Sequence, residues 1–416
     1  MSNDPIAVTG YGAVTPIGND AGEFIRRMRL GDSGVGPITA FATDGLETRF
    51  AASVALSDEE LAGGDRRLAR RKDRFVLMAL RAAREAMAHA GLAAGAWADP
   101  YRVAVQIGTG IGGIGTLVRE HQTLLTRGAD RVSPFLIPRM IGNMASGDVA
   151  LALGAKGPTW TIVTACATGA NALHAAALLI RSGTVDVAIT GGAEAATTPL
   201  TIAGFNAAGA LSRRNDAPAR ASRPFDRGRD GFVIGEGAGV LVLESLAHAR
   251  ARGAVIHGLL AGCASTDDAY HETNPDPEGA GLATAVRLAL REAGTGADAL
   301  GYINAHGTST KLNDLTESAA LRRALGADLD RVWVSSTKSM IGHTMGAAGA
   351  LEAIATVSAL RDGILPPTIN LDDPDPECAL RHVAQVAVEQ RITAALSVNM
   401  GFGGHNGCLV FQRTGT

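Results

Sequence analysis

The chain has 416 residues, of which 46% are hydrophobic and only 4% aromatic, and it carries 52 glycines and a formal net charge of −3. Its length exceeds the size at which one hydrophobic core stops growing, and its composition fits an α/β protein rather than a fibrous or disordered chain. The slightly acidic balance argues against a general nucleic-acid-binding protein, whose binding domain is normally basic. Two core units in an α/β fold are therefore predicted.

The cysteines and the amino-terminal segment indicate the cellular compartment in which the protein is expected. The four cysteines are dispersed without CxxC spacing, which indicates neither a zinc site nor a disulfide framework, and a reducing cytosol is their natural setting. The segment MSNDPIAVTGYG has no positive stretch before an apolar one, and no apolar run is long enough to span a membrane. We expect a soluble, cytoplasmic protein with no metal and no membrane or nucleic-acid partner.

Short apolar runs alternate with alanine-rich amphipathic runs, a pattern typical of strands alternating with helices around buried sheets. In the first part of the chain, strands are predicted at residues 6–8, 103–108, 159–164, 186–190 and 238–243. In the second part, they are predicted at residues 256–261, 299–303, 332–335, 394–399 and 407–411. A polar turn near residues 252–253 separates the two parts, so the predicted halves are residues 1–253 and 254–416.

An internal echo links the two halves. The segments TIVTACATGANALHAAALLI and VWVSSTKSMIGHTMGAAGALEAIATVSAL both pass from a β-branched strand, through small polar residues, into a long alanine-rich helix. This predicts two similar core units, although alanine-rich helices follow strands in many α/β folds.

Cys166 lies between the predicted strand 159–164 and the helix that begins near Gly169. A side chain at such a turn projects from the sheet, and the N-terminus of the helix favours a thiolate. The small neighbours Ala165 and Ala167 leave room for a substrate. Cysteine is also among the most buried residue types, so the same position suits a packed structural thiol.

Two histidines lie beside glycines after predicted strands: His306 in INAHGTST and His343 in KSMIGHTMG. Such histidines reach a pocket more freely than those on a helix face, although a lone histidine is more often structural. Four others fall within helical patterns and are interpreted as structural: His89, His121, His174 and His248.

The segments VTACATG, NAHGTST, SSTKSMIGHTMGAAGALE and GFGGHN occur in an order that resembles the active-site signatures of β-ketoacyl-acyl-carrier-protein synthases, the elongating condensing enzymes. Further matches cover nearly the whole chain: RPFDRGRDGFVIGEGAGVLVLE, GTGIGGIG, SPFLIPRMIGNM, GGAEAATTPL and DAYHETNPDPEG. The resemblance implies a thiolase-like five-layered α-β-α-β-α fold made of two related halves, and an obligate dimer.

The same resemblance implies the chemistry. Cys166 would accept an acyl group from acyl carrier protein as a thioester. His306 and His343 would face the malonyl thioester on a second carrier protein and stabilise, through Nε2–H, the enolate that forms as carbon dioxide leaves. The backbone N–H groups of Cys166 and Phe402 would hold the tetrahedral oxyanion. No cofactor is required, because decarboxylation drives the step and the carrier supplies the phosphopantetheine.

Supporting roles are also implied. Lys338 would orient the histidines with a carboxylate partner, either Glu352 or Glu317, and Phe402 would gate the site. The implied acyl-pocket positions, which suit ordinary core equally well, are Ile111, Phe135 and Phe205. Further implied substrate-binding residues are Thr308, Thr310, Met400 and Gly403.

The segment RRLARRKDR, residues 66–74, concentrates positive charge in an otherwise acidic chain. Such a run is usually a solvated helix face. The resemblance favours a docking surface for the acidic carrier protein, since electrostatic steering suits a brief encounter. The residues assigned to it are Arg67, Arg70, Arg71 and Lys72.

Three positions depart from the fatty-acid pattern: Asn399 and Met400 replace a Ser-Phe pair, and Lys311 replaces a proline. The segment PDPECAL resembles ketosynthase subunits of type II polyketide systems, whereas ACATG resembles the fatty-acid branch. Two hypotheses follow, a fatty-acid homodimer or the catalytic half of a heterodimer with a chain-length factor. A thiolase is disfavoured, because Phe402 stands where its second cysteine would be, and a non-catalytic subunit would lack Cys166.

Overall fold

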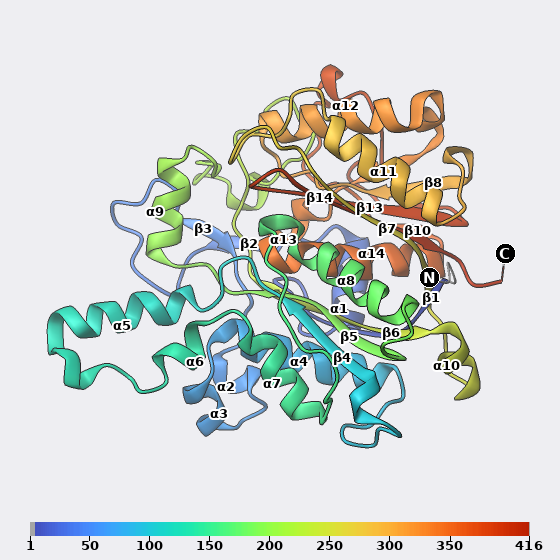
Figure 1. The fold of residues 1–416 in the computed structure, drawn as a ribbon. Coiled ribbons are helices and arrows are strands. Elements are labelled where there is room, and N and C mark those ends of the chain that lie inside the picture. The colour runs from blue at the N-terminus through green and yellow to red at the C-terminus, as the bar shows by residue number, and fades with distance from the viewer. Residues whose placement is uncertain (1–4, 416) are drawn as a thin grey trace.

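The computed structural model describes residues 5–415 and shows one large mixed sheet with helices on both sides and through its middle (Figure 1). The strand order is β11-β9-β8-β13-β14-β7-β1-β6-β5-β4. The N-terminal half supplies β1 (Ile6–Val14), β4 (Val103–Gly108), β5 (Val187–Glu194) and β6 (Gly237–Ser245). The C-terminal half supplies β7 (Gly258–Asp267), β8 (Leu300–Asn304), β9 (Trp333–Ser335), β11 (Arg381–His382), β13 (Ala394–Gly401) and β14 (His405–Gln412).

The two halves of the sheet meet along a short seam. There, residues 6–8 of β1 pair with residues 258–260 of β7, and the strands then diverge. Two small ladders lie outside the main sheet: β2 (Val35–Pro37) with β3 (Phe50–Ala52), and β10 (Ile364–Leu365) with β12 (Val388–Glu389).

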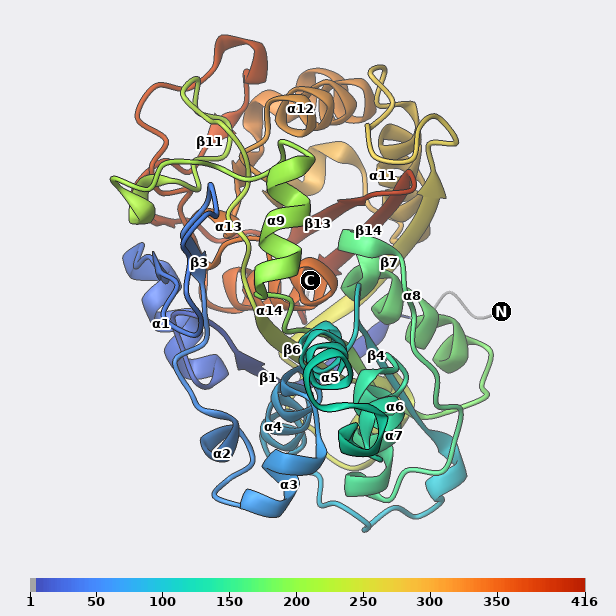
Figure 2. The same cartoon turned by 90° about the vertical axis from the view of Figure 1, so that its left-hand side faces the viewer.

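The helices form three layers, seen edge-on in Figure 2. The outer layer of the N-terminal half includes α4 (Arg74–His89) and α7 (Met144–Leu153), and that of the C-terminal half includes α11 (Ala280–Glu292) and α12 (Lys311–Leu325). Between the half-sheets lie α8 (Thr168–Arg181) and α14 (Ala348–Asp362), which share one apolar core. The expected five-layered α-β-α-β-α fold is confirmed.

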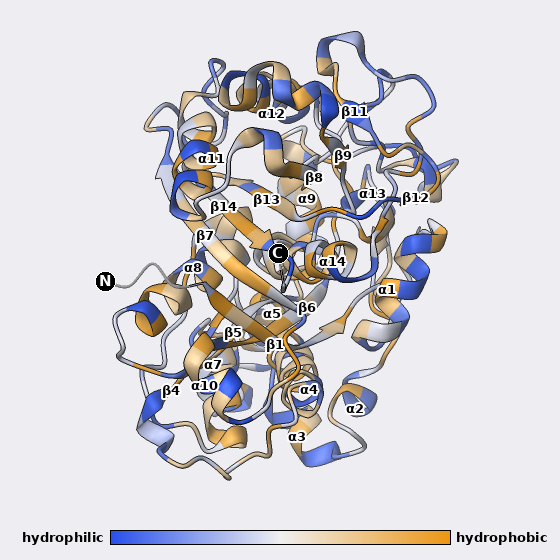
Figure 3. Ribbon diagram, turned by 90° about the vertical axis from the view of Figure 1, so that its right-hand side faces the viewer, coloured by the Kyte–Doolittle hydropathy of each residue, from blue (hydrophilic) through white to orange (hydrophobic). Residues whose placement is uncertain are grey.

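Burial explains which helices take which layer. Residues 348–360 of α14 are all buried, and the segment is rich in alanine with apolar residues on every side, as a helix between two sheets requires. By contrast, α11 and α12 have hydrophilic residues on their outer faces (Figure 3). Peripheral helices are α1 (Ala21–Leu30), α2 (Asp58–Leu61), α3 (Arg66–Arg71), α5 (Ile114–Arg127), α6 (Leu136–Met140), α9 (Pro199–Ala207) and α10 (Leu246–Ala251). The short helix α13 (Lys338–Ile341) is entirely buried.

The internal echo is visible in the backbone. A 3₁₀ turn, Ala165–Ala167, leads into α8, and a second one, Met345–Ala347, leads into α14. The first residue of each turn has a positive φ, +48° at Ala165 and +45° at Met345, which is uncommon for residues other than glycine. The two halves therefore build the same turn at the N-terminus of their central helix.

The prediction of a strand at residues 159–164 is wrong, whereas the other nine predicted strands are present with shifted ends. The segment runs beside β4 with a single β-bridge at Thr159. The Ser146 hydroxyl lies between the two, accepting from the Ile107 N–H at 2.8 Å and donating to the Trp160 carbonyl at 2.9 Å. A side chain from α7 thus takes the place of ladder hydrogen bonds, which no local pattern reveals.

Candidate active site

Cys166 lies in the 3₁₀ turn before α8, where the Thr164 N–H donates to the Thr168 hydroxyl at 2.8 Å. The backbone N–H of Phe402 acts on the Cys166 thiol and lowers its pKa. Burial raises the pKa of this thiol to about 12, and the nearby Lys338 cation only partly opposes that effect. The expectation that the helix terminus favours a thiolate therefore does not describe the resting site, because desolvation outweighs it.

His306 and His343 are both buried, with ring centroids 5.3 Å apart and ring planes at 86°. Burial, with the Lys338 charge second, holds the pKa of each well below its ordinary value, so both rings are neutral. The Nδ1 of His343 accepts from the Met345 N–H at 3.3 Å. In a neutral ring the proton then resides on Nε2, which makes Nε2–H the donor available to a substrate.

Lys338 pairs with Glu352 and not with Glu317, which resolves the alternative left open by the sequence. Its Nζ donates to Glu352 Oε1, and both side chains are almost completely buried. The other carboxylate oxygen, Oε2, accepts from the Asn399 side chain at 2.6 Å. One buried carboxylate therefore connects α13, α14 and β13.

The Lys338–Glu352 pair leads to a stability prediction. Lys338→Met is expected to lower the free energy of unfolding by about 3–5 kcal/mol, because the Glu352 charge would remain buried without its partner. Urea unfolding measures this loss. The double variant Lys338→Met, Glu352→Leu removes both charges and should recover most of the stability. A double variant no more stable than the single one would contradict the explanation.

Glu317 has a different task. It lies on α12, and its carboxylate accepts the backbone N–H of His306 at 2.6 Å and that of Gly307 at 2.8 Å. Burial raises its pKa to about 7, and the two N–H donors oppose that shift. Glu317 therefore fixes the backbone that presents His306.

Glu194, at the end of β5, is a buried residue that motif reasoning missed. Its carboxylate accepts from the backbone N–H groups of Gly110 at 2.7 Å, Ile111 at 3.2 Å and Gly346 at 3.1 Å. It thereby ties the loop at residues 109–112 to the turn before α14. A single acid at the end of the apolar run VAITGGAE is the sequence signal that could have revealed it.

The turn at residues 401–404 lies against the Cys166 turn. A Cβ added to Gly401 would lie 3.1 Å from the Cys166 nitrogen and 2.8 Å from the Thr164 oxygen, so only glycine permits this approach. Gly403 and Gly404 have φ of +87° and +82°. The Gly403 N–H donates to the Glu272 carbonyl at 2.8 Å, which holds the turn that carries Phe402.

The chain matches the family model of the β-ketoacyl synthase N-terminal domain over residues 3–249 and that of the C-terminal domain over residues 257–372. The chain belongs to the β-ketoacyl synthase family. The resemblance carried by the sequence motifs is thereby confirmed.

Individual relatives cover the whole synthase. It is 48% identical to 3-oxoacyl-[acyl-carrier-protein] synthase 2 of Synechocystis sp., over 98% of both chains, and 46% identical to that of Coxiella burnetii, over 99% of both. Among solved structures, a chain of the ishigamide ketosynthase/chain length factor aligns with a TM-score of 0.91 and 35% identity. The alignment covers 100% of this chain and 100% of that one. A chain from the complex of a type II PKS acyl-carrier protein with its ketosynthase aligns with a TM-score of 0.90 and 34% identity. The alignment covers 99% of this chain and 99% of that one.

Some predicted lining residues of the synthase adjoin the histidines. The ring of Phe205, on α9, lies 5.2 Å from that of Phe232, which in turn lies 5.4 Å from that of His343. Phe232 was missed by motif reasoning, because it falls inside a long match with no chemistry-bearing neighbour. Thr308 is buried, and its hydroxyl lies 2.9 Å from that of Thr310.

Other predicted lining residues have different surroundings. Met400 is buried in the core between β13 and the outer helices of the C-terminal half. Ile111, Phe135 and Phe402 are exposed in the single chain. The ring of Phe135 lies under the Arg71 guanidinium at 4.9 Å.

The basic run forms α3 and the residues after it. Arg67, Arg70 and Arg71 are exposed. The Lys72 ammonium, however, is bound to Asp148 at 2.6 Å, and its side chain is only 21% exposed. The three arginines therefore offer positive charge to solvent, whereas the charge of Lys72 is already neutralised.

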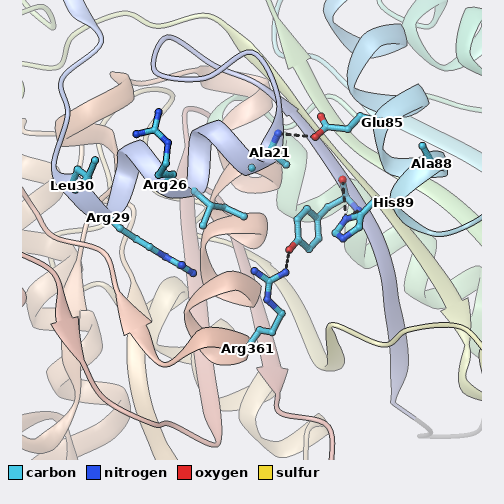
Figure 4. Close-up of a pocket in the computed structure, with 11 residues that line it drawn as sticks. Ala21, Arg26, Arg29, Leu30, Glu85, Ala88, His89 and Arg361 are labelled. Atoms are coloured by element: carbon cyan, nitrogen blue, oxygen red, sulfur yellow. Dashed lines mark hydrogen bonds between the residues drawn. The ribbon is translucent and has the colours of Figure 1, made fainter.

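A pocket of about 680 Å³ lies elsewhere, between α1, α4 and the end of α14 (Figure 4). Arg361 donates to the Tyr11 hydroxyl and, at 2.7 Å, to Asp362, which also binds Arg29. Asp362 thus supplies one negative charge for the two guanidinium groups of Arg29 and Arg361 and does not neutralise both. The residues that line this pocket include no predicted site residue of the synthase.

Proposed function

We propose that this synthase joins an acyl chain carried by Cys166 to malonyl-acyl carrier protein, giving β-ketoacyl-acyl carrier protein and carbon dioxide. The observation that carries the proposal is the grouping of a nucleophilic thiol, the Phe402 N–H and two neutral buried histidines. Full-length relatives 44–48% identical to the chain are 3-oxoacyl-acyl-carrier-protein synthases.

The first half-reaction is acyl transfer. The Cys166 sulfur attacks the acyl thioester, the bond to the carrier sulfur breaks, and the carrier leaves as a thiol with the proton that Cys166 gives up. Because the resting thiol has a pKa of about 12, this proton must leave as the sulfur attacks. The N–H groups of Phe402 and Cys166 stabilise the oxyanion.

The second half-reaction is condensation. The bond between the malonyl carbon and its carboxylate breaks, carbon dioxide leaves, and the electron pair forms an enolate held by Nε2–H of His306 and His343. The enolate carbon attacks the acyl-Cys166 carbonyl, and the sulfur leaves as thiolate and is reprotonated. Neutral histidines suit this task, because they donate without giving up a proton. The sequence of steps uses no metal or redox cofactor.

Each half of the chain supplies different catalytic residues. Residues 1–253 supply the nucleophile, and residues 254–416 supply both histidines, Lys338 and Phe402. Thr308, Thr310 and Gly403 are proposed to contact the malonyl arm or the acyl chain. Met400, which was predicted to bind substrate, packs in the core of the C-terminal half instead. We place the enzyme in the cytoplasm, where its four free cysteines suit a reducing environment.

The proposed assembly is a dimer through the segment beside β4. Trp160 is 42% exposed and Val163 is 59% exposed on a backbone edge with a single β-bridge to β4. An apolar edge of this kind invites pairing with a second chain. Ile111 and Phe135, exposed in the single chain, would then line the acyl pocket across the dimer.

The identities favour a fatty-acid homodimer, since the chain is 48% identical to the 3-oxoacyl synthase 2 of Synechocystis sp. and 34% identical to the aligned chain of the type II PKS complex. A heterodimer with a chain-length factor is the second candidate, supported by the full-length match to the ishigamide ketosynthase/chain length factor. The test is the purified chain alone, incubated with a panel of acyl carriers and malonyl carrier. A fully active homodimer would exclude the heterodimer, and inactivity relieved only by a partner subunit would exclude the homodimer.

The exposed arginines predict the docking surface. Arg70→Glu with Arg71→Glu is expected to raise KM for malonyl carrier about tenfold at low salt with little change in kcat, because steering of an acidic carrier would be lost. The difference from wild type should shrink as salt screens the charges. Arg250→Glu, an exposed site on α10, is the matched control. An equal rise in KM for both variants would contradict a local docking surface.

A further inference from the structure

Asn399 is a buried residue near the active site that makes no hydrogen bond to Cys166, His306 or His343. It lies on β13, is fully buried, and precedes Phe402 by three residues. Its Nδ2 donates to Glu352 Oε2 at 2.6 Å, and its Oδ1 has no hydrogen-bond partner among residues 5–415. Burying an amide oxygen without a partner costs free energy, so the orientation of this side chain is set by its one strong hydrogen bond, the one to Glu352.

With that bond, both carboxylate oxygens of Glu352 have a hydrogen-bond donor. Lys338 donates to Oε1 and Asn399 to Oε2, so each carboxylate oxygen has one donor. Lys338 is the cation that acts on all three reacting side chains, Cys166, His306 and His343. Asn399 therefore connects to the chemistry through one carboxylate and one ammonium.

We propose that Asn399 is a positioning residue that holds Glu352, and through it the Lys338 ammonium, in place, and so sets the reactivity of Cys166. The inference rests on the proposed function of Cys166. It concerns a position at which this chain departs from the Ser-Phe pattern of fatty-acid synthases.

The electrostatics support this role. Burial raises the pKa of Glu352, while the Lys338 cation and the Asn399 amide both lower it. A donor to the ionised form stabilises that form. The Lys338 charge in turn lowers the pKa of Cys166, against the effect of burial. Glu352 itself raises the pKa of Cys166, so the effect expected from losing the Asn399 donor acts through Lys338. An ammonium that is no longer held by a fixed carboxylate lowers the pKa of the thiol less, and the thiol then reacts more slowly.

Several other titratable groups face the pair. They are Cys166 before α8, Tyr302 from β8, His306 after β8, Glu317 from α12 and His343 before α14. Of the side chains bonded to Glu352, only that of Asn399 is an uncharged amide. Replacing it by a carboxyl group of the same shape therefore introduces one new titration.

The experiment compares two substitutions by the rate at which iodoacetamide alkylates Cys166 between pH 6 and 9. Asn399→Ala removes the donor, and the rate is expected to fall about threefold to tenfold by a similar factor at every pH. Asn399→Asp donates when protonated, so its rate should approach wild type at pH 6 and fall progressively below it toward pH 9. The progressive loss reports a new carboxyl group, which a purely structural defect does not produce.

Val398→Ala, on the opposite face of the same strand, controls for loss of packing. A wild-type rate in Asn399→Ala, or a pH-independent effect in Asn399→Asp, would overturn the proposal, as would a rate loss in Val398→Ala as large as that in Asn399→Ala. If the proposed function itself were wrong, the wild-type enzyme would form no β-ketoacyl product, whatever the alkylation rates of the variants. That result differs from each of the three that would overturn the role of Asn399. Wild-type condensation with altered rates in the Asn399 variants only is the supporting result.

Discussion

Cys166→Ala is expected to abolish acyl-enzyme formation and to reduce condensation by about 10⁴-fold or more, because the acyl group has no other acceptor at the site. Intact-mass analysis after incubation with acyl carrier protein measures the covalent adduct directly. Cys378→Ala, a buried cysteine in the C-terminal half, is the control and should retain the adduct. An acyl adduct that persists in Cys166→Ala would refute the assignment of the nucleophile.

Cys166→Gln separates the two half-reactions. A glutamine amide imitates the acylated cysteine, so this variant should release carbon dioxide from malonyl carrier without forming the β-keto product. The pKa values of His306 and His343 lie well below the ordinary range, and both rings stay neutral as the pH falls from 7 to 6. Carbon dioxide release should therefore change little across that interval. Its absence at both pH values would contradict the role given to the histidines.

His343→Ala is expected to lower condensation about 10²- to 10³-fold while acylation of Cys166 stays within about tenfold of wild type. The reason is that the His343 Nε2–H stabilises the enolate, which forms only after acyl transfer is complete. His306→Ala should show the same separation. The measurements are single-turnover acylation by intact mass and carbon dioxide release from malonyl carrier.

A control keeps the histidine result interpretable. His121→Ala, on the exposed face of α5, should leave both half-reactions unchanged. Equal losses of acylation and decarboxylation in His343→Ala, with a lowered melting temperature, would indicate a structural role for the ring instead.

Local sequence patterns were sufficient for much of the fold. Nine of the ten predicted strands are present, because alternating apolar and alanine-rich runs report burial directly. The exception, residues 159–164, has an apolar composition but lies beside Ser146, whose hydroxyl replaces the ladder. Its composition suits an interface with a second chain, and a single sequence does not distinguish that interface from an interior strand.

The sequence by itself determined the chemistry: a thiol at Cys166, imidazoles at His306 and His343, and a glycine turn around Phe402, each within a short motif whose spacing is a local property. Only the tertiary structure decided which groups meet. It paired Lys338 with Glu352 rather than Glu317, placed Asn399 on the second oxygen of Glu352, and put Glu194 under two loops. These contacts join separate elements through the packing of α8 and α14 between the half-sheets. Burial, and with it the raised pKa of Cys166, follows from that packing and not from any neighbour in the chain.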